Sequence, residues 1–338
     1  MSGNSNNKAM PRRRIDLLTV AACAALVGLM VMLADPLPAQ SESVMNDAPE
    51  YTGEGIGSCI SCHGPDDEEP AHEILATPHA VIGDPKSPFG EGAHDCESCH
   101  GPSKAHLTRN EDGSRPAVDF VFDDSTLPED QNAVCLSCHQ DATRFHWPGS
   151  VHDQEGLACV NCHDIHKVDD PVLALETQPQ VCFDCHQQQQ AQFLRQSRHP
   201  VQATSNAFSH TGLLSCTDCH NPHGSATPGM LEHTTLNEQC YECHAEKRGP
   251  FLWEHAPVRE DCSNCHTPHG SNYENLLTAR QPWMCQQCHV APQHPSGVYS
   301  GAGIPPNGAD QRILGKQCLN CHSQIHGTNH PSGIRLTR

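Results

Sequence analysis

The sequence has few of the side chains that usually fill a protein interior. Aromatic residues make up only 4% of the 338 residues, and hydrophobic residues make up 36%. That is little for a chain of this length to bury as an ordinary core. Sustained alternation of polar and apolar residues is also missing, which predicts almost no β-sheet. We therefore expect something other than Leu, Ile and Phe to occupy the interior.

Positive charge is scarce as well. The chain has 20 Lys and Arg against 40 Asp and Glu, a formal net charge of −20. Such a balance disfavours nucleic acids and anionic lipid surfaces as partners. The simplest interpretation is a well-hydrated acidic surface, and we predict no nucleic-acid partner.

The first 39 residues have the pattern of a targeting segment. A basic start at residues 8–14 precedes the almost unbroken apolar run 17–34, and Ala39 is a suitable cleavage point. The apolar run is also just long enough to cross a membrane, so a retained anchor stays open as an alternative. We predict a cleaved signal peptide at 1–39 and an exported domain at 40–338.

Cysteine is the outlier, with 21 residues. Apart from Cys23, which lies in the predicted signal peptide, all of them form Cys-x-x-Cys pairs that are followed at once by histidine. The cysteines are Cys59, Cys62, Cys96, Cys99, Cys135, Cys138, Cys159, Cys162, Cys182, Cys185, Cys216, Cys219, Cys240, Cys243, Cys262, Cys265, Cys285, Cys288, Cys318 and Cys321.

Three chemistries use paired cysteines. Disulfides suit an exported protein and zinc sites use Cys-x-x-Cys, but neither requires an adjoining histidine in all ten copies. Covalent attachment of haem c does, because both thiols bond to one porphyrin and the imidazole binds its iron. We predict ten covalently attached haem c groups with proximal ligands His63, His100, His139, His163, His186, His220, His244, His266, His289 and His322.

The histidines outside the motifs supply candidates for the opposite side of each iron. The motifs fall into five two-motif units, which begin at 59/96, 135/159, 182/216, 240/262 and 285/318. In each unit one histidine stands between the motifs and another follows the second motif. These predicted distal ligands are His79, His106, His152, His166, His199, His223, His255, His269, His294 and His326.

Some of these choices have competitors. Six histidines remain, and His146 competes with His152, His210 with His199, and His330 with His326; the others are His72, His94 and His233. A histidine only three residues past its motif is too close to reach round its own haem, so we expect it to serve a neighbouring one. Residues 40–338 contain only three methionines, so we predict bis-histidine ligation and low potentials.

The fold class expected from this pattern is a multihaem c-type cytochrome. Short helices and loops would wrap round an elongated chain of ten haems, with almost no β-sheet. Pro222 and Pro268 stand where a helix must stop. Residues 187–192 predict a longer helix that continues from the motif at 182–186.

Several stretches resemble the MtrA/DmsE family of periplasmic decahaem cytochromes, which also includes PioA. The likeness covers nearly all of residues 55–333. The stretches are ATPHAVIGDPKSPFG (76–90), CESCHGPSKAH (96–106), GSVHDQEGLACVNCHDIH (149–166), SRHP (197–200), CTDCHNPHGS (216–225), CHAEKRGPFLWEHAPVREDCSNCHTPHGS (243–271) and CHSQIHGTNHPSG (321–333).

The resemblance implies an electron conduit of the periplasm and outer membrane. Its implied partners are an outer-membrane β-barrel porin-like protein, periplasmic or inner-membrane cytochromes that give or take electrons, and an extracellular multihaem cytochrome. It also implies two pentahaem halves, about 55–200 and 201–335. The boundary between these halves falls inside the third two-motif unit. The alternatives are a soluble periplasmic electron shuttle or store, and a multihaem reductase, which would need an iron with a free position. An electron carrier without bond chemistry is the expectation.

The motif count gives a direct prediction. A pyridine haemochrome assay of the protein matured with its haems should report ten haems per chain, because every Cys-x-x-Cys-His copy is complete. A count of six or fewer would contradict the interpretation of the motifs.

Overall fold

The computed structural model describes residues 49–67, 71–201, 214–289 and 317–337. The chain divides into two compact units, Met1–Ala48 and Pro49–Arg338, and the described residues lie in the second. The predicted signal peptide, His210 and the predicted ligand His294 lie outside the described residues.

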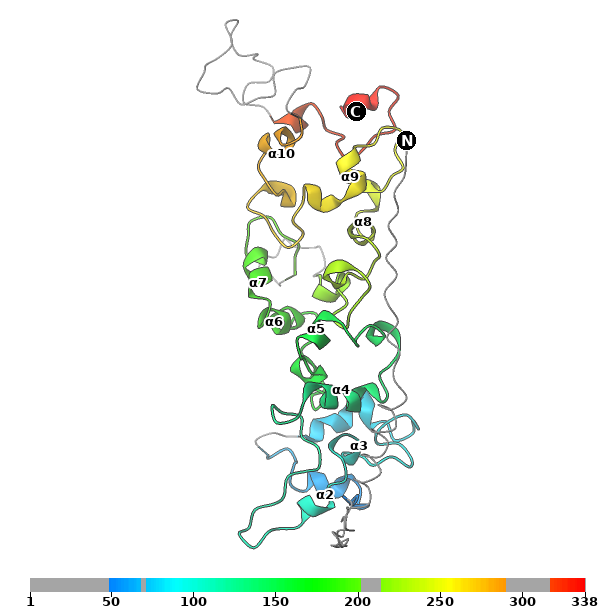
Figure 1. Cartoon of the computed structure of the whole chain (residues 1–338), viewed down its shortest axis with the longest axis vertical. Helices are drawn as coiled ribbons and strands as arrows, with labels where there is room; N and C mark the ends of the chain where they lie inside the picture. The colour runs from blue at the N-terminus through cyan, green and yellow to red at the C-terminus, as the bar shows by residue number, and fades with distance from the viewer. Residues whose placement is uncertain (1–48, 68–70, 202–213, 290–316, 338) are drawn as a thin grey trace, which may run out of the picture. The chain divides into compact units, whose positions relative to one another are not determined.

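The described residues form short helices joined by loops (Figure 1). Within them there is no strand, only four isolated bridges, and no helix with the length and apolar character needed to cross a membrane. The α-helices are α2 (Ile56–Ile60), α3 (Glu97–His100), α4 (Pro128–Leu136), α5 (Val151–Gln154), α6 (Gln178–Phe183), α7 (Gln187–Phe193), α8 (Leu236–Tyr241), α9 (Ala256–Glu260) and α10 (Trp283–Gln286).

Single 3-10 turns fill much of the remaining chain. They are η1 (His72–Ala76), η2 (Pro78–Ala80), η3 (Lys104–Leu107), η4 (Ala142–Arg144), η5 (Cys159–Asn161), η6 (Cys216–Asp218), η7 (Pro228–Met230), η8 (Ala245–Lys247), η9 (Cys262–Asn264), η10 (Glu274–Leu276), η11 (Cys318–Asn320) and η12 (Gly333–Arg335). The scarcity of sheet and the short helices confirm the secondary structure expected from the sequence, namely short helices and loops with almost no β-sheet.

The two motifs of a unit begin on different elements. The first motif starts on an α-helix, namely α2, α4, α6, α8 or α10, whereas the second starts on a 3-10 turn or, in the first unit, beside the four-residue α3. In all ten motifs the histidine N–H donates to the carbonyl of the first cysteine, at 2.9–3.0 Å. Each motif is therefore one closed helical turn, which places its two thiols and its imidazole on one side.

The prediction of one long helix across residues 182–192 is wrong. The chain forms two helices there, α6 and α7, and the break falls at Asp184–His186. His186 has φ −88° and ψ 56°, outside the α-helical region. The motif turn closes on Cys182, and α7 starts in a new direction after His186.

The apolar core is small. Seven hydrophobic side chains are buried among the described residues: Phe89, Trp147, Ala158, Phe183, Phe193, Val201 and Leu277. Three of them, Phe183, Phe193 and Val201, form one cluster against Leu214 and Cys216. Such a core is too small to hold so long a chain by itself, as the composition led us to expect.

Buried amides join the two motifs within a unit. Asn132, which is 3% exposed, accepts a hydrogen bond from the Cys159 N–H at 2.8 Å. Asn237 accepts one from the Cys262 N–H at the same distance, and in the third unit Gln178 takes this role toward Thr217. The sequence analysis missed these residues, although Asn132 and Asn237 both precede a first motif cysteine by three positions.

We predict that Asn132→Ala destabilises the haem-loaded protein by about 1–3 kcal/mol, because the part-buried Cys159 N–H would lose the acceptor that Asn132 provides. Chemical denaturation followed by absorption would measure the loss. Asn110, which is exposed and bonded to Ser114 at 2.9 Å, provides the control, and Asn110→Ala should cost less than about 0.5 kcal/mol. Equal losses in both variants would contradict a specific role for Asn132.

Candidate haem-binding sites

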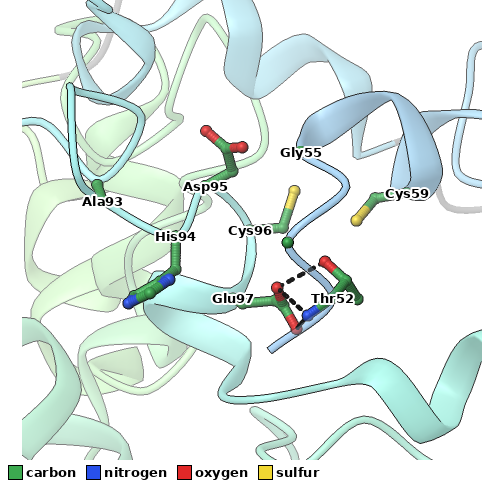
Figure 2. A pocket seen from close by; sticks show the side chains of 9 residues that line it. Thr52, Gly55, Cys59, Ala93, His94, Asp95, Cys96 and Glu97 are labelled. Atoms are coloured by element: carbon green, nitrogen blue, oxygen red, sulfur yellow. Dashed lines mark hydrogen bonds between the residues drawn. The ribbon is translucent and has the colours of Figure 1, made fainter. Parts of the chain in front are cut away.

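The two motifs of each unit meet through their first cysteines. A hydrogen bond from Cys96 lowers the pKa of Cys59 to about 6, and the contact raises the pKa of Cys96. Figure 2 shows the two thiols facing each other across the hollow that both residues line. The same contact occurs between Cys135 and Cys159, Cys182 and Cys216, Cys240 and Cys262, and Cys285 and Cys318. None of the twenty motif cysteines forms a disulfide.

Glu97 fixes the chain around the first hollow. Its side chain is 7% exposed and accepts a hydrogen bond from the Thr52 N–H at 3.0 Å (Figure 2). It also accepts one from the Ser103 N–H at 2.7 Å. His94 also lines the hollow, and its ring stacks on Tyr51 with centroids 3.8 Å apart. That distance leaves no room between the two rings, so His94 is engaged in a direct stack.

Successive units meet through the second cysteine of the second motif. Burial raises the pKa of Cys99, and the nearby thiols Cys135 and Cys138 of the next unit raise it further. The same arrangement recurs at Cys162, Cys219 and Cys265, each of which lies near cysteines of the following unit. Neighbouring motifs in the sequence are therefore neighbours in space.

Nine of the ten motif histidines face a second histidine. The ring centroids are 5.9–6.4 Å apart in every pair. The pairs are His63–His106, His139–His79, His100–His166, His186–His152, His163–His223, His244–His199, His220–His269, His289–His255 and His266–His326. The expected partner of His322 is His294, which lies outside the described residues.

This spacing fits an iron between the two imidazoles. A metal–nitrogen bond of about 2 Å on each side, with about 1 Å more from each nitrogen to its ring centre, separates the centroids by about 6 Å. Direct ring stacking, as between Tyr51 and His94, is more than 2 Å closer. With two thiols on the same turn as the proximal histidine, each pair has the donor set that haem c requires.

The pairs follow one rule along the chain. The second motif histidine of a unit faces the histidine after the second motif of the next unit, as His163 faces His223. The first motif histidine faces a histidine of the preceding unit, as His186 faces His152. Each joint between successive units thus contains two facing pairs, and His63–His106 alone among the nine lies within one unit.

The competing histidines that the structure describes have other contacts. His146 is exposed and its ring contacts Phe145, and His330 is bonded to Ser332 through Nδ1. His233 lies 3.5 Å from Glu242. Together with His72 and His94, these side chains take part in none of the facing histidine pairs.

A backbone carbonyl connects the two histidines that neighbouring units contribute to each other's pairs. His152 Nδ1 donates to the Pro222 carbonyl at 2.8 Å, directly before His223. His199 Nδ1 donates to the Pro268 carbonyl at 2.7 Å, directly before His269. The two histidines exchanged across a joint are therefore tied to each other through one peptide group.

Glycine permits the close approach that this contact needs. A Cβ on Gly224 would lie 2.5 Å from the His146 carbonyl oxygen, and its φ of 106° favours glycine. A Cβ on Gly270 would collide with the Gln192 carbonyl oxygen. Any larger residue would push the following unit away from the preceding one.

Several paired histidines also have a fixed tautomer. An oxygen that can only accept lies against Nδ1 of His100, His106, His220 and His266, at 2.6–3.1 Å. The proton must then sit on Nδ1, which leaves the lone pair of Nε2 for a metal. Burial lowers the pKa of His223 to about 4, and the neutral ring that this favours is the form that binds iron.

These sites define a multihaem c-type cytochrome, an electron-transfer protein that carries haem c on Cys-x-x-Cys-His motifs. Two family models match the chain. The doubled CXXCH motif matches residues 210–249 and 255–294, and the NrfB-like cytochrome c-type protein matches residues 96–185.

The chain belongs to the MtrA family of multihaem cytochromes. It is 46% identical over 231 residues to the multiheme cytochrome MtrA of Shewanella baltica, which covers 68% of this chain and 67% of that protein. It is also 36% identical over 64 residues to the cytochrome c-type protein NrfB of Escherichia coli and 35% identical over 74 residues to that of Haemophilus influenzae. Those alignments cover 34% and 32% of the two NrfB proteins.

The distal assignment can be tested on two histidines in one segment. We predict that His152→Ala opens one iron and produces a high-spin signal from one haem, because His152 faces His186. His146→Ala should leave the spectrum wholly low-spin, because His146 takes part in no pair. Ferric absorption and EPR spectra of both variants would decide, and the opposite result would reassign the ligand.

Proposed function

We propose that this protein carries electrons through ten bis-histidine haem c groups across the outer membrane. It would be exported to the periplasm, lose its signal peptide and associate with the outer membrane inside a β-barrel partner. Its other partners would be periplasmic or inner-membrane cytochromes on one side and an extracellular multihaem cytochrome on the other. The MtrA relationship supports each of these assignments.

The observation that carries the proposal is the unbroken series of facing histidine pairs. Haem c held between them would supply reversible one-electron chemistry. The paired imidazoles would occupy both axial positions in at least nine of the ten sites, which leaves no iron position there for a substrate. The chain would then transfer electrons without making or breaking substrate bonds.

The series also favours transfer over storage. Neighbouring motifs contact each other through Cys59 and Cys96 within a unit and through Cys99 and Cys135 between units. An electron could therefore pass from motif to motif in sequence order. Isolated haem sites would be enough to store electrons, whereas conduction needs a continuous series of sites.

We predict that the haem-loaded chain, assembled with a β-barrel partner in liposomes, reduces a dye trapped inside when a reductant is added outside. Transfer should require both proteins, because the chain needs a barrel to reach through lipid. Liposomes with the barrel alone, or with the chain added outside, are the controls. Equal dye reduction without the chain, or none with both proteins present, would contradict a conduit, and the latter would favour a periplasmic shuttle.

A further inference from the structure

Nδ1 of His163 contacts a carboxylate, whereas Nδ1 of four other motif histidines contacts a backbone carbonyl. Asp170 Oδ2 lies 2.8 Å from His163 Nδ1, so the imidazole N–H donates to a carboxylate. We propose that Asp170 is a potential-tuning residue that makes the haem of the motif 159–163 more difficult to reduce than its neighbours. The inference rests on the proposed function, in which His163 and His223 hold that haem.

The carboxylate is held in place by its own loop. Its second oxygen, Oδ1, accepts from the Asp164 N–H and the Val172 N–H, each at 3.3 Å. The side chain is 11% exposed, so water screens its charge little. Lys167, a cation of the same loop, bonds to Asp164 at 2.6 Å.

The other second motifs provide the comparison. His100, His220, His266 and His322 all donate through Nδ1 to a backbone carbonyl, at 2.7–3.1 Å. Those acceptors are neutral. Among the five second motifs, the one at 159–163 alone has a charged acceptor on its histidine.

Carboxylates also lie near His63 and His244, but both contacts are more exposed. Glu246 Oε1 is 3.9 Å from His244 Nδ1, and these two side chains are 61% and 56% exposed. Asp67 Oδ2 lies 3.0 Å from His63 Nδ1, and the two side chains are 32% and 50% exposed. Solvent and salt screen both charges more strongly than that of Asp170. The effect of Asp170 should therefore be the largest.

The expected effect of Asp170 on the haem potential follows from its negative charge. A hydrogen bond to a carboxylate is about twice as strong as one to a neutral acceptor, and it makes the opposite ring nitrogen a stronger donor to a metal. The oxidised iron carries one more positive charge than the reduced iron, so a nearby fixed negative charge stabilises the oxidised form. Hydrogen bonding and charge beyond the direct ligands are among the means by which proteins set haem potentials.

Asp170 acts on a haem inside the series of motifs, so it would affect electron conduction. The motif 159–163 is the fourth of ten and meets the next unit through Cys162, near Cys182 and Cys185. A haem of lower potential there would place an uphill step inside the series. The potentials would then not run smoothly from one end to the other.

The test is Asp170→Asn in the full haem-loaded chain. Asparagine has nearly the same shape and can still accept from His163, but it carries no charge. We expect the reduction equilibrium of one haem to shift about tenfold toward the reduced form, which corresponds to about 59 mV for one electron. Potentiometric titration followed by absorption would measure it.

EPR shows whether the shifted haem belongs to the five near-parallel pairs, whose ring angles are 8–27°. The rings of His163 and His223 are 8° from parallel, the smallest angle among the nine pairs, whereas those of His79 and His139 are 77° apart. Near-parallel and near-perpendicular imidazoles give low-spin ferric signals of different shape. We expect one component of the near-parallel type of signal to disappear at a higher potential in Asp170→Asn.

Asp169→Asn is the matched control, because it removes the same charge from the exposed residue next to Asp170 in the same loop. It should leave the potential of that haem within a twofold change in its equilibrium. Equal shifts in both variants, no shift in Asp170→Asn, or loss of one haem from Asp170→Asn would overturn the tuning role. A low haem count in the unmodified protein would instead overturn the proposed function.

Discussion

The exchange of histidines between successive units is the interaction on which the rest of the structure depends. At every joint, two motif histidines face partners from the other side, with ring centres about 6 Å apart. The buried apolar core is small, and the described residues form no sheet. Each motif histidine of the second, third and fourth units faces a histidine that a neighbouring unit supplies. Packing of the units and completion of the sites are therefore the same event.

Short stretches of sequence encode most of a joint. In Cys262–Gly270, as in Cys216–Gly224, one segment supplies the two thiols, the motif histidine, a prolyl carbonyl, the exchanged histidine and a glycine. The carbonyl orients the histidine that arrives from the preceding unit. The glycine lets the two backbones approach. Repetition of this stretch builds similar joints from a short length of polypeptide.

The repeated geometry does not make the sites identical. Nδ1 of several paired histidines bonds to a neutral oxygen, as in His100, His220 and His266, whereas Nδ1 of His163 bonds to a largely buried carboxylate. The angle between paired rings ranges from 8° for His163–His223 to 77° for His139–His79. Ligand orientation and hydrogen bonding both act on the electronic state of a bound metal. The sites thus share one donor set and differ in their surroundings.

The predictions that succeeded from sequence concern local chemistry. The spacing of Cys262, Cys265 and His266 is enough to place all three on one turn, since contacts three and four residues apart are formed by any helical turn. The scarcity of sheet and the small apolar core also follow from composition and pattern. By contrast, the single helix expected across 182–192 is broken at His186, because the motif turn ends there.

Tertiary structure alone decided which histidines meet. His146 and His152 lie six residues apart and are equivalent by sequence, yet only His152 faces a motif histidine. His163 and His223 meet although they lie 60 positions apart in the chain. Such contacts depend on how whole units pack, through buried amides such as Asn132 and close backbone contacts such as that at Gly224. Local sequence therefore determined the half of each site that one turn can build, and packing determined the other half, because its ligand comes from a distant part of the chain.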